Sequence, residues 1–247
     1  MNCDSPPPQP PAAACFFYAP GRWEQDIYTI PSEAALVALI SQQNPPAKPR
    51  WPFENETANA MRNPSRHPGN FAGTLAVATL FPLAGHVLTQ NPDFKIFTHL
   101  RGMIHSHLWT EAATSAAKVY FGRKRPFYDT VERRGEARRD DRLSFFSGHS
   151  SHAFALASYG SQLAFSELKD SPSAWLYATL LHGTATWIAT SRAIDKQHNW
   201  SDVLAGAAVG STIGYFTFQR VDNVSRSPLT VAFEPRRVSL QLKMELQ

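Results

Sequence analysis

The sequence predicts an all-α protein, a helical bundle with a β-hairpin after its last helix. Four or more apolar segments of helical length follow one another, most of them opened by a helix-start signal, and no alternating strand pattern lies between them. The last part of the chain changes to strict alternation of apolar and polar residues. With 247 residues, 43% of them apolar, the chain is long enough for one well-buried core.

Helix-start signals place the helices in order along the chain. Ser32 before Glu33 and the apolar run 34–40 predicts a capped helix that ends before residues 44–46. The sequence Asn91-Pro92-Asp93 predicts the next start, with a helical pattern that breaks near Trp109 and continues to about Phe121. Three later helices each open at a serine: Ser147 (to about Phe165), Ser171-Pro172 (to about Arg192) and Ser201-Asp202 (to about Phe218).

The two ends of the chain differ from this helical domain, which we place at residues 21–220. Residues 1–20 are rich in proline and predict a disordered linker, and they lack the basic start and apolar run of a signal peptide. In the tail, residues 221–247, apolar residues alternate with polar ones on both sides of the turn-like sequence 234–237. This pattern predicts the β-hairpin.

The charge balance points to an anionic partner. The net charge is +4 and the pI is about 9.2, with much of the excess in the arginine-rich segment 129–142, which we expect to be a solvated loop. Without a continuous basic stripe, an anionic substrate or a lipid surface is favoured over nucleic acid. Several uncharged stretches approach the length of a membrane span, but polar residues dilute each of them, so buried helices are favoured.

Three short blocks of sequence supply groups that could hold and cleave a phosphate ester. Lys118, Arg125 and Arg192 can neutralise the charge on phosphoryl oxygens, and an arginine fork can bind two oxygens at once. Pro126 directly after Arg125 predicts a bend that holds this arginine in place. With three cations available, we expect no metal ion to be needed.

The second block, Ser147-Gly148-His149, stands where a helix is predicted to begin. Backbone N–H groups at a helix start point outward with the positive end of the dipole behind them, which favours anion binding. Gly148 lets an oxygen approach the backbone closely, and the Ser147 hydroxyl adds a donor. His149 on the first turn is a candidate general acid.

In the third block, His198 precedes a predicted helix start and Asp202 follows it by four residues. A carboxylate beside an imidazole can fix one ring nitrogen and leave the other free to attack phosphorus. His198 is therefore the candidate nucleophile, with Asp202 as the group that orients it.

Together these blocks resemble the three-part signature of the type 2 phosphatidic acid phosphatase (PAP2) superfamily, which also contains bacterial class A acid phosphatases and vanadium-dependent haloperoxidases. The resemblance implies a helical bundle of that type and a metal-independent phosphatase acting on phosphate monoesters or lipid phosphates and pyrophosphates, outside the cytoplasm. It implies a phosphohistidine on His198, with His149 as acid and then base. The implied phosphate pocket consists of Lys118, Arg125, Ser147, Gly148 and Arg192. One difference is Phe146, where many members carry proline.

Other interpretations stay open at this point. Taken singly, Lys118 and Arg125 could be surface cations, Ser147 only a helix cap, and His198 with Asp202 a solvent-facing pair. A vanadium haloperoxidase would use the same pocket with vanadate as its cofactor, whereas in a phosphatase we expect vanadate to inhibit. A phosphate- or lipid-binding module without turnover is the non-enzymatic alternative. Peripheral membrane contact is compatible with the hydrolase, and the remaining histidines show no metal-ligand spacing and are expected to pack in the core or on the surface.

Overall fold

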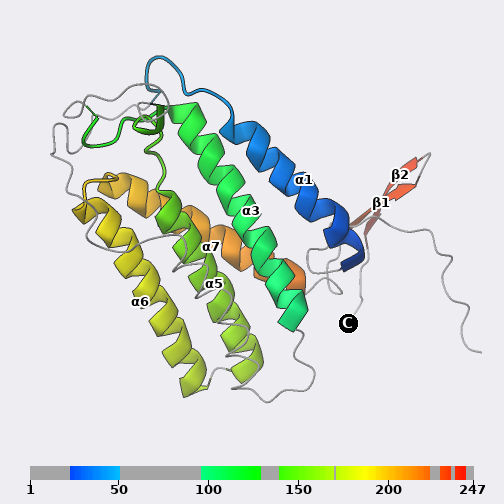
Figure 1. The fold of residues 1–247 in the computed structure, drawn as a ribbon. Helices are drawn as coiled ribbons and strands as arrows, with labels where there is room; N and C mark the ends of the chain where they lie inside the picture. Colours follow the sequence, from blue (N-terminus) through cyan, green and yellow to red (C-terminus); the bar gives the residue numbers. More distant parts are fainter. Residues whose placement is uncertain are drawn as a thin grey trace, which may run out of the picture.

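A computed structural model describes residues 23–50, 96–128, 139–169, 171–222, 229–234 and 237–242. Within these ranges the chain forms long helices that pack side by side, followed by a small hairpin (Figure 1). The helices are α1 (Trp23–Ser41), α3 (Ile96–Phe121), α5 (Gly148–Leu168), α6 (Pro172–Ile194) and α7 (Trp200–Asp222). The strands are β1 (Leu229–Glu234) and β2 (Arg237–Leu242). The all-α bundle predicted from the sequence is confirmed.

The serine signals locate the later helices well. Ser147 is the N-cap of α5 and Ser171 that of α6, each accepting a hydrogen bond from the backbone N–H three residues on. Helix α7 begins at Trp200, one residue before the predicted Ser201. Helix α3 runs through Trp109 without a break, so the predicted interruption is wrong. The start signal at 91–93 and the linker 1–20 lie outside the described residues.

The first helix starts much earlier than predicted. Helix α1 begins at Trp23 and contains Pro31, and Ser32 is not its cap. Instead the Ser32 hydroxyl donates to the carbonyl of Tyr28 one turn back, at 2.7 Å. The preceding turns were missed because Pro31 and Ser32 together look like a helix start when only the local sequence is considered.

Helices α5 and α7 approach closely along a row of small residues. A Cβ added to Gly206, Gly210 or Gly214 of α7 would lie 2.7, 2.0 and 2.1 Å from the backbone oxygens of Ser147, Ser151 and Ala155, respectively. Glycine is therefore required for this contact. The Ser147 N–H donates to the Asp202 carbonyl at 3.0 Å, so the starts of the two helices are joined.

The apolar core lies between α3, α5, α6 and α7, with α5 in the middle. Its largest cluster contains Met103, Leu156, Tyr159, Leu163 and Phe218. His99 belongs to this region: its ring stacks on Phe218, and its Nδ1 lies 3.2 Å from the Tyr159 hydroxyl. The expectation that such histidines pack in the core is confirmed for His99.

Helix α1 is joined to α3 by a buried charged network. The His105 ring, fully buried, lies with Nδ1 2.8 Å from Glu33 Oε2 and with Nε2 2.9 Å from Asp26 Oδ1. Arg101 donates to the other Asp26 oxygen at 2.6 Å. Burial alone would lower the pKa of His105, but its bonds to the two carboxylates outweigh burial and raise it. The charged His105 ring therefore links the two helices through ionic hydrogen bonds.

The described end of the arginine-rich segment is not simply solvated, contrary to expectation. Arg139 Nη2 donates to the backbone carbonyls of Ser41 and Gln43 at 2.6 and 2.7 Å. Arg142 Nη2 donates to the carbonyls of Pro46 and Ala47. These contacts hold the chain that follows α1 against the segment that precedes α5, and they satisfy carbonyls at the end of a helix.

The hairpin predicted for the tail is present, with β1 and β2 antiparallel and Glu234 paired with Arg237 beside the turn. Among the helices that the structure describes, none is long and apolar enough to cross a membrane.

Candidate functional site

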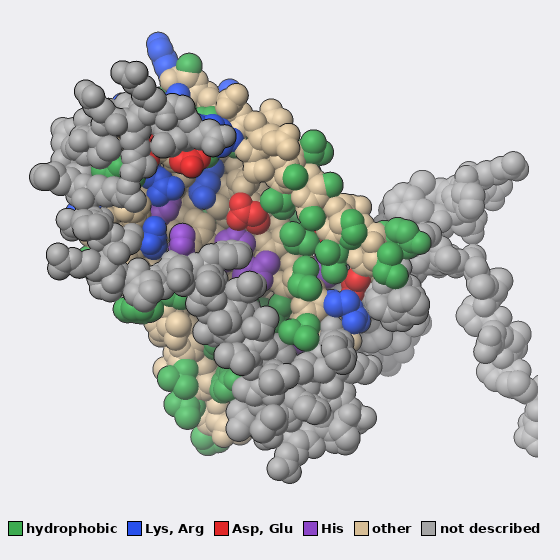
Figure 2. Space-filling view, viewed as in Figure 1, with side chains coloured by type: hydrophobic (Ala, Val, Ile, Leu, Met, Phe, Trp, Pro, Cys, Tyr) green, Lys and Arg blue, Asp and Glu red, His purple; other side chains and the backbone are tan. Residues whose placement is uncertain are grey.

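The sequence-predicted site residues gather at one end of the bundle, where α3 and α6 end and α5 and α7 begin (Figure 1). Lys118 lies in the last turn of α3 and Arg192 in the last turn of α6. His149 lies on the first turn of α5, and His198 lies two residues before the start of α7. Figure 2 shows lysine and arginine side chains beside histidines on this part of the surface. The positive ends of the α5 and α7 dipoles add to the same potential.

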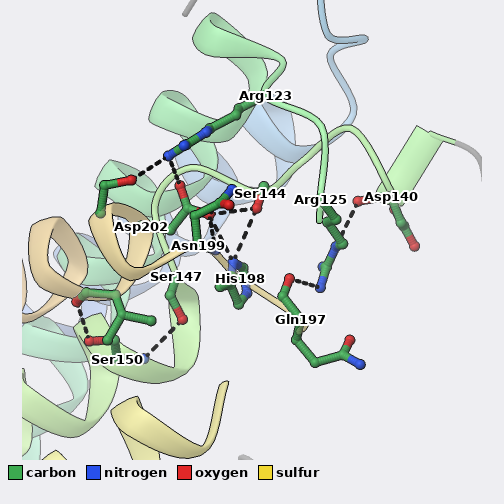
Figure 3. Close-up of polar contacts among 12 residues, drawn as sticks. Arg123, Arg125, Asp140, Ser144, Ser147, Ser150, Gln197, His198, Asn199 and Asp202 are labelled. Atoms are coloured by element: carbon green, nitrogen blue, oxygen red, sulfur yellow. Dashed lines mark hydrogen bonds and ion pairs between the residues drawn. The ribbon is translucent and has the colours of Figure 1, made fainter. Parts of the chain in front are cut away.

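His198 is held by a serine that stands between it and a carboxylate. Ser144 Oγ lies 2.7 Å from Asp202 Oδ2 and 3.4 Å from His198 Nδ1 (Figure 3). An ionised carboxylate only accepts hydrogen bonds, so the serine hydroxyl donates to Asp202 and its lone pair accepts the proton of Nδ1. Asp202 Oδ2 itself lies 3.7 Å from Nδ1. This arrangement keeps the proton on Nδ1 and leaves Nε2 with its lone pair.

Asp202 is the centre of this network and is fully buried. Arg123 Nη1 lies 2.6 Å from Oδ1, and the Asn199 backbone N–H donates to Oδ2 at 2.9 Å. Burial alone would raise the pKa of Asp202, but His198, Arg123 and Ser144 outweigh burial and lower it. The interpretation of His198 and Asp202 as a solvent-facing pair is wrong, since His198 is also only 3% exposed.

Burial also keeps His198 neutral. Burial lowers the pKa of His198 to about 4. The charges of Arg125 and Lys118 lower it further, whereas Asp202 acts in the opposite direction. A neutral ring with a free Nε2 is the form that a nucleophilic histidine needs at pH 7.

Arg125 and Lys118 place positive charge beside this ring. Arg125 is fixed by its own side chain, which donates to the carbonyls of Asp140 at 3.2 Å and Gln197 at 3.4 Å (Figure 3). Residues 126–128 form the predicted turn, closed by a bond from the Tyr128 N–H to the Arg125 carbonyl. Burial, then the charge of Arg125, lowers the pKa of Lys118 to about 8. Two cations held this close favour binding of an anion.

His149 and Gly148 complete the group. A Cβ added to Gly148 would lie 3.4 Å from Lys118 Nζ, so the helix start faces this ammonium. The pKa of His149 is lowered to about 3. Burial is the largest cause, and four nearby charged or titratable groups lower it further: Arg192, His198, Lys118 and Arg125. The charges of the three predicted cations and of His198 thus act on the His149 ring, and a shared phosphate pocket stays a prediction.

Ser147 has the role of a helix cap. Its Oγ accepts from the Ser150 N–H at 3.4 Å, and the residue is fully buried. Its part in binding phosphate stays a prediction. Phe146, which stands where many family members carry proline, is also buried beside it.

Arg123, Ser144 and Asn199 were missed from the sequence. Arg123 was not among the predicted site residues, yet it is 1% exposed and pairs with a carboxylate 79 positions away. No local spacing links Ser144 to Asp202. The alternation of Arg123 with Arg125 before Pro126 was the available signal for the arginine, because alternate residues of an extended segment point to opposite sides.

Comparison with known proteins shows the family of the helical part of the chain. The sequence profile of the PAP2 superfamily matches residues 100–226, which contain every one of the predicted site residues. The chain belongs to the PAP2 superfamily. It is also similar to a PA-phosphatase related-family protein of Dictyostelium discoideum, with 34% identity over 127 residues. That match covers 47% of this chain and 46% of the relative, so the chain spans about half the length of this curated relative. No solved structure matches significantly.

Membership of the PAP2 superfamily accounts for the order of the three blocks. The family region starts within α3 and ends just past α7, so α1 and the hairpin lie outside it. In the described part of the chain, no group of three or more His, Cys, Asp or Glu residues is arranged to hold a metal ion.

Proposed function

We propose that this PAP2 protein is a phosphatase that hydrolyses phosphate monoesters or lipid phosphates and pyrophosphates through a phosphohistidine on His198, without a metal ion. The observation that carries the proposal is the surroundings of His198. Its Nδ1 faces Ser144 and Asp202, which favours a proton on that nitrogen, and the charges of Arg125 and Lys118 act on the neutral ring. A nucleophile and the charges that would neutralise a phosphoryl group are thus in one place.

In the first step, Nε2 of His198 attacks phosphorus, and the bond between phosphorus and the ester oxygen breaks. Lys118, Arg125 and Arg192 neutralise the equatorial oxygens, and His149 donates a proton to the leaving oxygen. In the second step, His149 takes a proton from water, which attacks the phosphohistidine and releases phosphate. Asp202, which Arg123 holds in place, stabilises the imidazolium character that develops on His198 in the first step.

The acid role of His149 requires the substrate. In the protein alone, its pKa of about 3 leaves the ring neutral at pH 7. A bound phosphate dianion would offset the charges of Arg192 and Lys118, which are among the causes of that low value, and would raise the pKa. Phosphate binding at neutral pH is therefore expected to take up a proton, which calorimetry in buffers of different ionisation enthalpy can measure.

Release of phosphate from p-nitrophenyl phosphate tests the activity. His198→Ala is expected to abolish release, and vanadate, which resembles the trigonal-bipyramidal transition state, is expected to inhibit the unmodified protein. His182→Ala is the matched control, because His182 bonds within the middle of α6, to the Ala178 carbonyl at 3.0 Å. Full turnover by His198→Ala, or turnover only after a divalent metal is added to chelator-treated protein, would contradict the proposal.

We also propose peripheral contact with a lipid surface through one face of α6. Large apolar side chains are exposed along it, including Leu176 at 62% and Leu180 at 59%, and Trp187 and Ile194 continue the row. Arg192 is the one charged residue within α6. Co-sedimentation with anionic vesicles should fall when Leu176 and Leu180 are changed to Ser. Location outside the cytoplasm, as the family resemblance implies, is part of this proposal and can be tested by cell fractionation.

A further inference from the structure

Beside the phosphate site, α3 and α5 carry a row of titratable side chains that the proposed mechanism does not use. Glu111 Oε2 lies 2.9 Å from His152 Nε2, and His152 Nδ1 lies 2.8 Å from His107 Nδ1. The two rings stack with their centroids 5.0 Å apart. Ser115 donates to the other oxygen of Glu111 at 2.7 Å. The carboxylate is thus held in one orientation.

The row reaches toward the phosphate site along one face of α3. Glu111 and Lys118 are seven residues apart, which is two helical turns, or about 10 Å along the axis. The charge of Lys118 helps lower the pKa of Glu111, and the charge of Glu111 opposes the lowering of the pKa of Lys118. The carboxylate therefore lies near enough to act on whatever is bound at the ammonium.

The Glu111 carboxylate has capacity for a further partner. Each of its oxygens accepts one hydrogen bond within the row, whereas an ionised carboxylate offers about four acceptor sites in all. The Glu111 side chain is 39% exposed, while His152, which holds it, is 5% exposed. The row thus presents an oriented acceptor to solvent about two helical turns from the site of phosphate binding.

We propose that Glu111 accepts a hydrogen bond from a hydroxyl on the leaving group, so that the enzyme prefers polyol phosphates of the glycerol phosphate type. This inference rests on the proposed phosphatase function. When a phosphate is bound at Lys118, its ester substituent points either away from helix α3 or along that helix. A substituent that lies along the helix comes next to Glu111. A second phosphate in that place would be repelled by the carboxylate. A plain hydrocarbon would gain nothing from it.

The other reading of the same contacts is that Glu111 acts only through Lys118, by keeping the ammonium charged. The two readings differ in what they predict for substrates. A residue that acts through Lys118 affects every phosphate ester equally. A residue that binds the leaving group affects only esters with a hydroxyl in reach.

The test compares glycerol 1-phosphate with n-propyl phosphate, which has the same carbon chain and no hydroxyl. Glu111→Leu keeps the volume and removes the acceptor, and Glu111→Gln retains a weaker acceptor. Glu167→Gln is the matched control, because Glu167 lies at the far end of α5, about 28 Å from Gly148 along the helix. Thermal unfolding of each variant verifies that it is folded, and phosphatidylglycerol phosphate in detergent micelles shows whether the same group is recognised in a lipid.

We expect the unmodified protein to prefer glycerol 1-phosphate by about tenfold in kcat/KM, the effect of one hydrogen bond to a charged group. Glu111→Leu should remove that preference and leave propyl phosphate within about twofold, with Glu111→Gln between the two. Equal loss on both esters, or no loss on either, overturns the inference while leaving the phosphatase intact. If the unmodified protein hydrolyses neither ester, the proposed function itself fails and the inference with it.

If phosphatidylglycerol phosphate shows the same dependence on Glu111, the recognised group is a lipid headgroup as well as a free polyol. Dependence with glycerol 1-phosphate alone restricts the inference to soluble esters.

Discussion

Arg123 Nη1 lies 2.6 Å from Asp202 Oδ1, and both side chains are buried at the base of the candidate site. The arginine also donates to the Ser201 hydroxyl at 2.7 Å. Asp202 in turn accepts from Ser144, which holds the His198 ring. The position of the candidate nucleophile therefore depends on a residue that was not among the predicted site residues.

Arg123→Gln is expected to destabilise the protein by about 3 kcal/mol, because it leaves a buried carboxylate without its charge partner. Activity should fall as well, since Asp202 then no longer holds Ser144 in place. Urea unfolding and phosphate release measure the two effects. Lys124→Gln is the matched control at the next position, where the ammonium lies over the Tyr128 ring, and a stability change of less than about 1 kcal/mol is expected. Equal effects at both positions would contradict the role assigned to Arg123.

The close approach of α5 and α7 gives a prediction about two glycines. Gly210→Ala would place a Cβ 2.0 Å from the Ser151 carbonyl oxygen, so the helices must separate. We expect a loss of about 3 kcal/mol or more in unfolding free energy. Gly183→Ala on α6 has no atom within 4 Å and should stabilise the protein by about 0.5–1 kcal/mol. Thermal or urea unfolding distinguishes them, and a neutral Gly210→Ala would show that the helices are not packed this way.

The network between α1 and α3 makes stability depend on pH. Because the two carboxylates raise the pKa of His105 in the folded protein, its contribution is fully present below the unfolded value of 6.5. It is lost as the pH rises through the folded value. The unfolding free energy, measured by urea unfolding, should therefore fall as the pH rises above 6.5. In His105→Gln this fall should be absent, and its persistence would assign it to another group.

The lowered pKa of Lys118 leads us to expect that phosphate affinity changes at alkaline pH. Its pKa of about 8 means that the ammonium is charged below that pH and neutral above it. Inorganic phosphate is mostly the dianion at these pH values, so its inhibition constant should rise through about pH 8 as the cation is lost. Lys118→Arg keeps its charge over this range and should give a flat profile. A profile that is the same in both proteins would exclude Lys118 from the phosphate pocket.

The sequence was most informative where function depends on residue type and local order. Lys118, His149, Arg192 and His198 were predicted together because their chemistry is shared and their spacing is regular, and α5 and α6 were located by the serines that cap them. A cap is a bond between neighbours in the chain, so it can be inferred from a few residues.

The contacts that hold the site could not be inferred in the same way. Ser144 and Asp202 are 58 positions apart, and His105 and Asp26 are 79 apart. Such pairs form only when helices from distant parts of the chain pack together, and no periodicity within one helix predicts them. Helix α1 was placed too late for a related reason, because its register is fixed by the buried pair of His105 and Glu33 and not by its own start signal.

Trapping the covalent intermediate tests the central claim most directly. The protein is mixed with a phosphate ester, quenched in alkali within one turnover, digested and analysed by mass spectrometry. We predict a phosphoryl group on His198 that is stable in alkali and lost in acid, and none in His198→Ala. A phosphoryl group on any other residue, or turnover with no phosphorylated residue at the earliest times, would contradict the account.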